Sequence, residues 1–460
     1  MLFSSQPFLL LFLPLCLLAY YTCARSYNAR VAVLTSASMI FYAWWDPRFV
    51  PLLGGMILLT WAVVRLDAVM RGSWILVLGV VANLSVLGLF KYANFFAENI
   101  LNTLEIPHRP WGIILPLGIS FFTFQQVSYL VDRYRGNAPT YGLLEYAAYV
   151  SFFPQLIAGP IVRHDQLIRQ FSESPWRDGL TEQVSRGVVL FTLGLIKKVF
   201  FADELAPIAD AGFDAVAAGE AISFGGSWIS SLAYSMQLYF DFSAYSDMAI
   251  GLGAMFALRL PLNFDAPYRA LNIRDFWQRW HMTLSSFLRD YVYIPLGGSR
   301  GSLVRTYWIV MATKLLCGLW HGAGWTFVAW GAVHGIAICM SRAWSRLGLS
   351  LPALVAWLVT MLFVIGGWVL FRAENFAVAQ AFFNAMSGVA GFDVVGVDWT
   401  DVNYVVIAAV FATIGPTNVT LSERVGLFKR RFAIAAACGL FLVTLRVGQG
   451  RGLEFIYFQF

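Results

Sequence analysis

The stretch LNIRDFWQRWHMTLSSFLRDYVYIPLGGSRG, residues 271–301, and the shorter KLLCGLWHGAGW, residues 314–325, hold the most unusual polar chemistry of this chain. His281 lies in the first stretch and His321 in the second, among only five histidines in 460 residues. The chain is 59% hydrophobic and 13% charged. We therefore expect the functional site here, with the remaining sequence as a helical scaffold around it.

The composition predicts a polytopic membrane protein, because its charged fraction is about half of the ~25% that is typical of globular proteins. A bilayer is crossed by about 20 apolar residues, so short loops leave room for about 11–13 transmembrane or re-entrant helices. The net charge of +6 comes with no basic cluster outside the apolar stretches. This pattern favours positively charged cytoplasmic loops and argues against nucleic-acid binding.

The chain shows no internal repeat, and its only sizeable loops are predicted at residues 203–225 and 383–401. Pro7–Cys23 lacks a basic flank and a small-residue cleavage site, so it is predicted to be a first span rather than a removed signal peptide. The five cysteines form no CxxC pair and lie in or beside apolar stretches. We expect buried thiols, with no disulfide framework and no metal site.

Two aspartates interrupt the apolar run SLAYSMQLYFDFSAYSDMAIGLG, residues 231–253. A carboxylate at bilayer depth costs at least about 2.5–3.5 kcal/mol unless it is paired or hydrated. Asp241 and Asp247 are therefore either part of a site or members of buried ion pairs. Arginines such as Arg274 or Arg289 would be the partners in the second case.

Arginine is concentrated between residues 258 and 305, a segment that contains seven arginines but only three aspartates. Asn272 begins a capping pattern, and apolar residues then recur at helical spacing as far as Tyr291, which predicts one amphipathic helix. His281 falls on its apolar stripe. The arginines fit either lipid headgroups or the phosphates of a donor molecule, because guanidinium groups bind phosphate in a bidentate manner.

His321 ends an apolar run in which Lys314, seven residues earlier, is expected to face the same way. Gly322 and Gly324 permit a helix break beside the imidazole. A buried neutral histidine can act as a general base, or it can simply bond a backbone carbonyl in the core. His334 is a weaker candidate of the same kind, and the sequence predicts that His108 and His164 are solvated.

Long and unusual strings carry a resemblance to a known family: LPLGISFFTFQQVSYLVDRYRG, FFPQLIAGPIVR, QLYFDFSAYSDMAIGLG, FWQRWHMTLSSFLRDYVYIPLGG and GLWHGAGWTFVAWGAVHG. The chain resembles the membrane-bound O-acyltransferases, and within them the bacterial branch of alginate O-acetyltransferase membrane subunits. The similarity runs nearly from end to end. The family's near-universal histidine matches His321, and its second polar active-site position matches His281.

The resemblance implies an all-α, polytopic membrane protein whose helices form a ring around a funnel that narrows to the buried histidine. It implies a single domain over residues 1–460, with N-terminal helices in 1–110, a catalytic core in 111–345 and C-terminal helices in 346–460. His321 would be the general base, and His281 would orient the acceptor, bind the oxyanion or assist the first imidazole.

For this branch the resemblance implies acetyl-CoA as the cytoplasmic donor. Arg274, Arg279, Arg289 and Lys314 are its candidate binding residues, chosen by charge. The acetyl group would cross the bacterial inner membrane to a hydrolase-like partner protein and finally to an exopolysaccharide such as alginate. Two alternatives stay open: D-alanyl or other acyl transfer from a carrier-protein thioester, and a non-enzymatic polysaccharide transport subunit.

Overall fold

The computed structural model describes residues 1–70, 73–106, 110–389, 391–394, 396–425, 438–440, 442–443, 446 and 455–456. These residues form nineteen α-helices, joined by turns and by short π- and 3-10-helical segments, and contain no strand. The predicted all-α fold class is confirmed. The chain divides into two compact units: unit 1 is Met1–Leu195, Tyr245–Leu262 and Leu421–Glu454, and unit 2 is Ile196–Ala244, Asn263–Thr420 and Phe455–Phe460.

Unit 1 holds the N-terminal helices, which follow a π-helical segment at Phe8–Phe12. They are α1 (Leu13–Thr22), α2 (Tyr27–Ala43), α3 (Val50–Met70), α4 (Trp74–Thr103), α5 (Ile119–Tyr134), α6 (Leu143–Ser151), α7 (Phe153–Leu156), α8 (His164–Phe171) and α9 (Leu180–Lys197). Two segments of this unit, Pro47–Met70 and Trp74–Thr103, are long and apolar enough to cross a membrane. Ala353–Arg372 of unit 2 is the third such helix within the described part of the chain.

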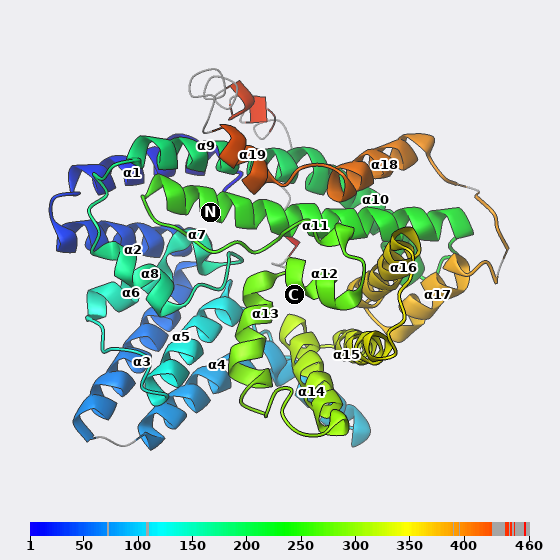
Figure 1. Cartoon of the computed structure of the whole chain (residues 1–460), viewed down its shortest axis with the longest axis horizontal. Helices are drawn as coiled ribbons and strands as arrows, with labels where there is room; N and C mark the ends of the chain where they lie inside the picture. Colours follow the sequence, from blue (N-terminus) through cyan, green and yellow to red (C-terminus); the bar gives the residue numbers. More distant parts are fainter. Residues whose placement is uncertain are drawn as a thin grey trace. The chain divides into compact units, whose positions relative to one another are not determined.

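Unit 2 holds the two stretches that carry His281 and His321. Its helices are α10 (Asp203–Ala217), most of α11 (Phe224–Met255), α12 (Ile273–Arg279), α13 (Met282–Leu288), α14 (Leu303–His321), α15 (Trp325–Arg346), α16 (Ala353–Arg372), α17 (Phe376–Met386) and α18 (Trp399–Thr413), and α19 (Asn418–Val425) begins at its boundary. Figure 1 labels these helices, with α12 and α13 in green beside the lime α14.

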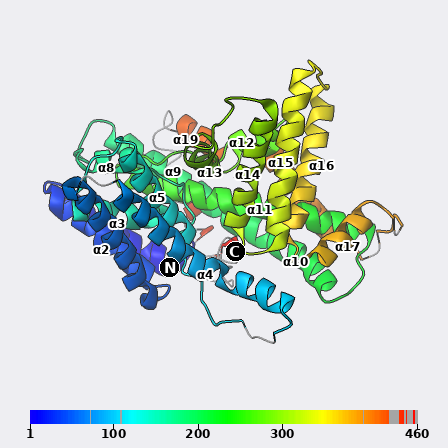
Figure 2. The same ribbon diagram turned by 90° about the horizontal axis from the view of Figure 1, so that it is seen from below.

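The helices α14 and α15 of unit 2 pack closely against each other. Two glycines let the helices approach closely, because a Cβ on Gly318 would lie 2.2 Å from the Phe327 carbonyl oxygen and one on Gly331 would lie 2.3 Å from the Lys314 carbonyl oxygen. Small residues at such contacts are typical of helices packed in membranes. In Figure 2, α14, α15 and α16 run side by side, in agreement with their contacts.

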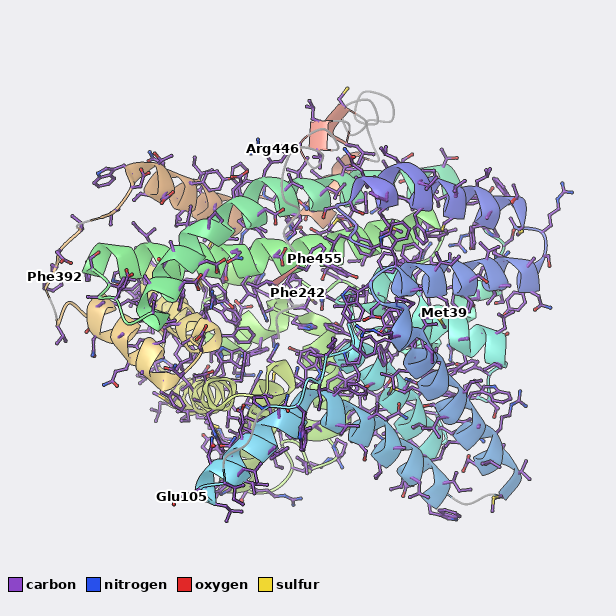
Figure 3. The ribbon with its side chains drawn as sticks, turned by 180° about the vertical axis from the view of Figure 1, so that it is seen from behind. Met39, Glu105, Phe242, Phe392, Arg446 and Phe455 are labelled. Carbon is purple, nitrogen blue, oxygen red and sulfur yellow. The ribbon has the colours of Figure 1, made fainter. Side chains whose placement is uncertain are left out.

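A buried charge cluster joins α11 to the start of α10. Lys198 Nζ lies 2.7 Å from Asp241 Oδ1 and 2.8 Å from Asp203 Oδ1. The backbone N–H of Ile456 donates to Asp241 Oδ2 at 2.6 Å, beside Phe455, which Figure 3 labels. Asp241 thus belongs to a buried ion pair, as one of its two predicted roles requires. The predicted arginine partner is wrong, because a lysine 43 residues earlier takes that place.

Replacing Asp241 with asparagine is expected to destabilise unit 2. The amide keeps an acceptor for the Ile456 N–H but removes one of the two carboxylates that compensate Lys198, and breaking a buried ion pair costs up to about 3–5 kcal/mol. Thermal unfolding in detergent, followed by tryptophan fluorescence, measures the loss. Glu173→Gln is the control, since it breaks an ion pair whose carboxylate is largely exposed and such pairs contribute about 0–1 kcal/mol. Equal melting temperatures for the two variants would contradict the prediction.

Three expectations about the scaffold are wrong. His164, expected to be solvated, is only 2% exposed: Nδ1 lies 2.9 Å from the Tyr141 hydroxyl and Nε2 lies 3.3 Å from Asp132 Oδ2. The predicted loop at 203–225 contains α10, in which buried residues recur at helical spacing. Among the cysteines, all free, Cys438 is exposed rather than buried. His108 lies outside the described residues.

Candidate active site

The predicted single helix from residue 272 to 291 is broken at His281. Asn272 caps α12 as expected, since its side chain accepts the backbone N–H groups of Arg274 and Asp275. At Trp280 the backbone becomes extended, and His281 adopts the left-handed conformation with φ 44° and ψ 55° before α13 begins. This conformation is strained for a residue with a Cβ and is often found at functional sites.

Asn263 holds the His281 ring in one tautomer. Asn263 Oδ1 lies 3.1 Å from His281 Nδ1 and also accepts the Thr283 backbone N–H and hydroxyl, at 3.3 and 2.8 Å. A backbone N–H can only donate, so the shared atom of Asn263 is its amide oxygen. His281 Nδ1 must therefore carry the proton, which leaves Nε2 as the basic nitrogen of a neutral ring.

Burial keeps His281 neutral. The residue is 0% exposed, and it lies between two short helices outside the three candidate membrane spans. Desolvation lowers the pKa of His281 to about 3. At working pH the ring is therefore an uncharged hydrogen-bond acceptor at Nε2, because the charged form is disfavoured away from water.

His281 and His321 lie against the same indole. The Trp320 ring centroid is 5.9 Å from that of His281 and 4.8 Å from that of His321, with both contacts edge-to-face. Phe242 of α11, labelled in Figure 3, packs on His281 at 4.7 Å. The structure thus brings together the two predicted catalytic histidines, which are 40 residues apart in the chain.

His321 is the last residue of α14 and is only 3% exposed. Trp330 and Phe371 pack edge-to-face on its ring at 5.1 and 5.2 Å. The helix stops here as predicted: Gly322 is extended, and a Cβ at this position would lie 2.1 Å from the Phe327 ring. A proton accepted by His321 places positive charge at the C-terminus of a helix, where the helix dipole favours it.

A cavity of about 470 Å³ in unit 2 is lined in part by α14, the helix that ends at His321, although neither His281 nor His321 is among its described lining residues. It is lined by Trp277, Gln278, Met282, Ser285, Ser286, Leu288, Arg289, Tyr293, Val310, Thr313, Lys314, Ile338 and Arg342. Met282 follows His281 directly in the chain. The volume is within the range of about 300–1,000 Å³ that is usual for ligand pockets.

Of the four predicted donor-binding residues, Arg289 and Lys314 line this cavity, whereas Arg274 and Arg279 do not. Arg289 is 61% exposed and pairs with Asp290. Arg279 is engaged by Asp275 at 2.7 Å. Arg274 is exposed. Lys314 is 8% exposed, and its ammonium lies 3.0 Å from the centroid of the Trp277 ring.

Sequence reasoning missed Arg342 and Trp277. Arg342 lines the cavity from α15 and donates to the Tyr293 hydroxyl at 3.2 Å. Its spacing of four residues from Ile338, another lining residue, is the signal that would have placed it on this face. Trp277 donates from Nε1 to His334 Nδ1 at 3.2 Å, so buried His334 has a partner inside the protein.

No group of three or more histidine, cysteine, aspartate or glutamate side chains in the described part of the chain is arranged to hold a metal ion. The arrangement instead suits proton transfer and anion binding. Two buried imidazoles share the Trp320 ring, and a cavity of the same unit has three basic side chains and no carboxylate among its described lining residues.

Comparison with known proteins identifies one matching family model, "MBOAT, membrane-bound O-acyltransferase family", over residues 74–378. A peptidoglycan O-acetyltransferase of Helicobacter pylori is 41% identical over 428 residues, which are 85% of this chain and 80% of the relative. A probable alginate O-acetylase of Pseudomonas aeruginosa is 45% identical over 403 residues, 84% of this chain and 75% of the relative.

A more distant relative is named for a different transfer. The teichoic acid D-alanyltransferase of Streptococcus thermophilus is 29% identical over 244 residues, which cover 50% of this chain and 57% of that protein. The resemblance predicted from the quoted strings, including the alginate O-acetylase branch, is therefore confirmed.

Proposed function

We propose a specific reaction for this chain, which belongs to the membrane-bound O-acyltransferase family and is an acyltransferase: transfer of an acetyl group from acetyl-CoA to an acceptor hydroxyl, with His321 as the general base. One observation carries the proposal. His321, at the family's histidine position, and His281 pack against the same Trp320 ring, and the helix that ends at His321 also lines a cavity with basic side chains.

In the proposed reaction the acceptor oxygen attacks the thioester carbonyl carbon while His321 takes the hydroxyl proton. The carbonyl is restored as the C–S bond breaks, and the proton passes from the imidazolium to the leaving thiolate. The products are an O-acetyl ester and the free thiol, so atoms and charge balance without a further reactant. A relay nucleophile that carries the acetyl group onward would follow the same steps.

His281 is suited to one of the three roles that the resemblance implies. Because Nδ1–H is bound to Asn263, the neutral ring offers only the lone pair of Nε2. It therefore accepts a hydrogen bond from a second donor group of the acceptor, beside the hydroxyl whose proton His321 takes, and so orients the acceptor rather than donating to an oxyanion. Such positioning raises the rate because the reacting atoms are already aligned.

We propose that the basic cavity receives the donor from the cytoplasmic side. Exposed Arg289 and half-buried Arg342 lie at its outer end and match the phosphates of CoA, since guanidinium groups bind phosphate strongly. The predicted roles of Arg274 and Arg279 are supported only by their charge, because neither lines the cavity.

The acetyl group is proposed to leave on the opposite face of the bacterial inner membrane, in which the chain is a multi-pass protein. A periplasmic or membrane-anchored hydrolase-like partner would receive it and acetylate an exopolysaccharide. The relatives named as alginate O-acetylases support an alginate-like acceptor, and the relative named as a peptidoglycan O-acetyltransferase supports peptidoglycan as the second choice.

A second candidate function is D-alanyl or other acyl transfer from a carrier-protein thioester. The relatives named as teichoic acid D-alanyltransferases favour it, at 26–29% identity. It uses the same histidines and the same thioester chemistry, and it differs in what is attached to the far end of the donor.

The test is thioester cleavage by the purified protein in lipid nanodiscs, with and without its hydrolase-like partner. Acetyl-CoA and an acetylated carrier protein are supplied in parallel, and free thiol and acetyl ester are both quantified. Turnover of acetyl-CoA supports the proposal. Turnover of the carrier-protein thioester alone selects the second candidate, and failure of every thioester would refute both.

Replacing Arg342 with glutamine is expected to raise the KM for acetyl-CoA about tenfold, the lower end for loss of a hydrogen bond to a charged group. The value of kcat should stay unchanged, because the phosphates are bound equally before and during the reaction. Arg346→Gln is the matched control, one turn further along α15, exposed and outside the cavity. Equal KM values for both variants would remove Arg342 from the donor site.

A further inference from the structure

Lys314 is a buried basic side chain that lines the cavity. Its ammonium lies over the Trp277 ring, so a cation–π contact holds the side chain in place. Among the described lining residues, three are basic and none is acidic, whereas Val310, Ile338 and Met282 are apolar. A buried ammonium retains N–H donors that are best satisfied by an oxygen acceptor from a bound molecule.

The spacing between Lys314 and His321 sets the distance, within a bound donor, between the oxygen held by Lys314 and the thioester that reacts at His321. Both residues lie on α14, seven positions apart, so they share a face and are separated by about 10.5 Å along the helix at 1.5 Å per residue. Arg289 and Arg342 line the same cavity. In the proposed function they hold the donor's phosphates, so the arm that leads from the phosphates to the thioester passes Lys314 on its way to His321.

We propose that Lys314 binds one amide carbonyl of the donor's pantetheine arm, the one between the pantoyl and β-alanine groups, which is the amide farther from the thioester. This inference rests on the proposed function, in which the thioester reacts at His321. Eight bonds separate the thioester sulfur from this carbonyl carbon, about 10 Å when extended at about 1.25 Å per bond. The second amide, next to cysteamine, is four bonds from the sulfur and too near His321 to reach Lys314.

The arm is common to CoA and to the prosthetic group of carrier proteins. Lys314 thus recognises the thioester donor whatever its far end carries, whereas Arg342 recognises the phosphates of CoA. Lys314 would recognise the arm and Arg342 the nucleotide. Their contributions to donor binding can be measured separately with donors that lack the nucleotide or part of the arm.

The experiment compares three acetyl thioesters: acetyl-CoA, acetyl-pantetheine and S-acetyl-N-acetylcysteamine. Acetyl-pantetheine lacks the nucleotide, and S-acetyl-N-acetylcysteamine also lacks the amide between the pantoyl and β-alanine groups. In Lys314→Met, we expect kcat/KM to fall about tenfold to hundredfold for the first two donors, the range for a hydrogen bond to a charged group. The shortest donor should react equally with wild type and variant. Lys197→Met is the matched control, since Lys197 is half-buried in unit 2 but does not line the cavity.

A second readout keeps this inference separate from the proposed reaction. Binding of unacylated pantetheine, measured by calorimetry, should weaken by a similar factor in Lys314→Met and remain unchanged in Lys197→Met. Equal losses on all three thioesters would overturn the inference, as would unchanged pantetheine binding. If pantetheine binding depends on Lys314 while no thioester is cleaved, the inference stands and the proposed reaction fails.

Discussion

Replacing His321 with glutamine is expected to lower acetyl transfer at least about 1000-fold, within the range of 10²–10⁴ attributed to a general base. Glutamine occupies a similar volume and keeps polar atoms at the end of α14, but its amide does not accept a proton at working pH. The loss should fall on kcat, and pantetheine binding should remain, because the cavity residues are untouched. Single-turnover measurement of thiol release in nanodiscs separates the rate of the chemical step from donor binding.

His164→Gln is the control for the loss of a buried histidine. His164 is buried in unit 1 with Tyr141 and Asp132 and lines no part of the proposed site. We expect this variant to lower the melting temperature while each folded molecule keeps wild-type turnover. A folded His321→Gln protein that transfers acetyl at the wild-type rate would remove His321 from the chemistry.

The local features of the site followed directly from residue types. The asparagine at 272 predicted the start of α12, and Gly322 predicted the end of α14 at His321, because caps and helix ends depend on neighbouring residues. The all-α class followed from apolar composition and helical spacing. These signals act over a few residues, so one sequence is sufficient to detect them.

The features that failed depend on contacts between distant residues. His281 fitted the apolar stripe of a continuous helix, but its backbone is left-handed beside bonds to Asn263, 18 positions earlier. Lys198 and Asp241 pair across 43 positions. Arg274 and Arg279 were predicted to bind the donor from their charge alone, whereas the cavity is lined by Arg342 of α15, 54 positions after the end of α13. No local pattern encodes such pairings.

Replacing His281 with asparagine is expected to lower kcat about 100-fold while leaving the fold intact. Asparagine tolerates the left-handed conformation of this position. Its amide nitrogen lies near the place of Nδ1, so it can still donate to Asn263 Oδ1. The variant loses only Nε2, the atom proposed to orient the acceptor. His281→Ala loses both nitrogens and should also be less stable, because Asn263 then loses a buried partner.

The pH dependence separates orientation from proton transfer. Because burial lowers the pKa of His281 to about 3, its ring stays neutral between pH 5 and 8 and contributes no step to the rate profile there. The acidic limb of kcat should therefore belong to another group, and it should keep its midpoint in His281→Asn while the plateau falls. If the limb moves or disappears in this variant, His281 is itself a proton acceptor in the reaction, and the division of labour between the two histidines must be reversed.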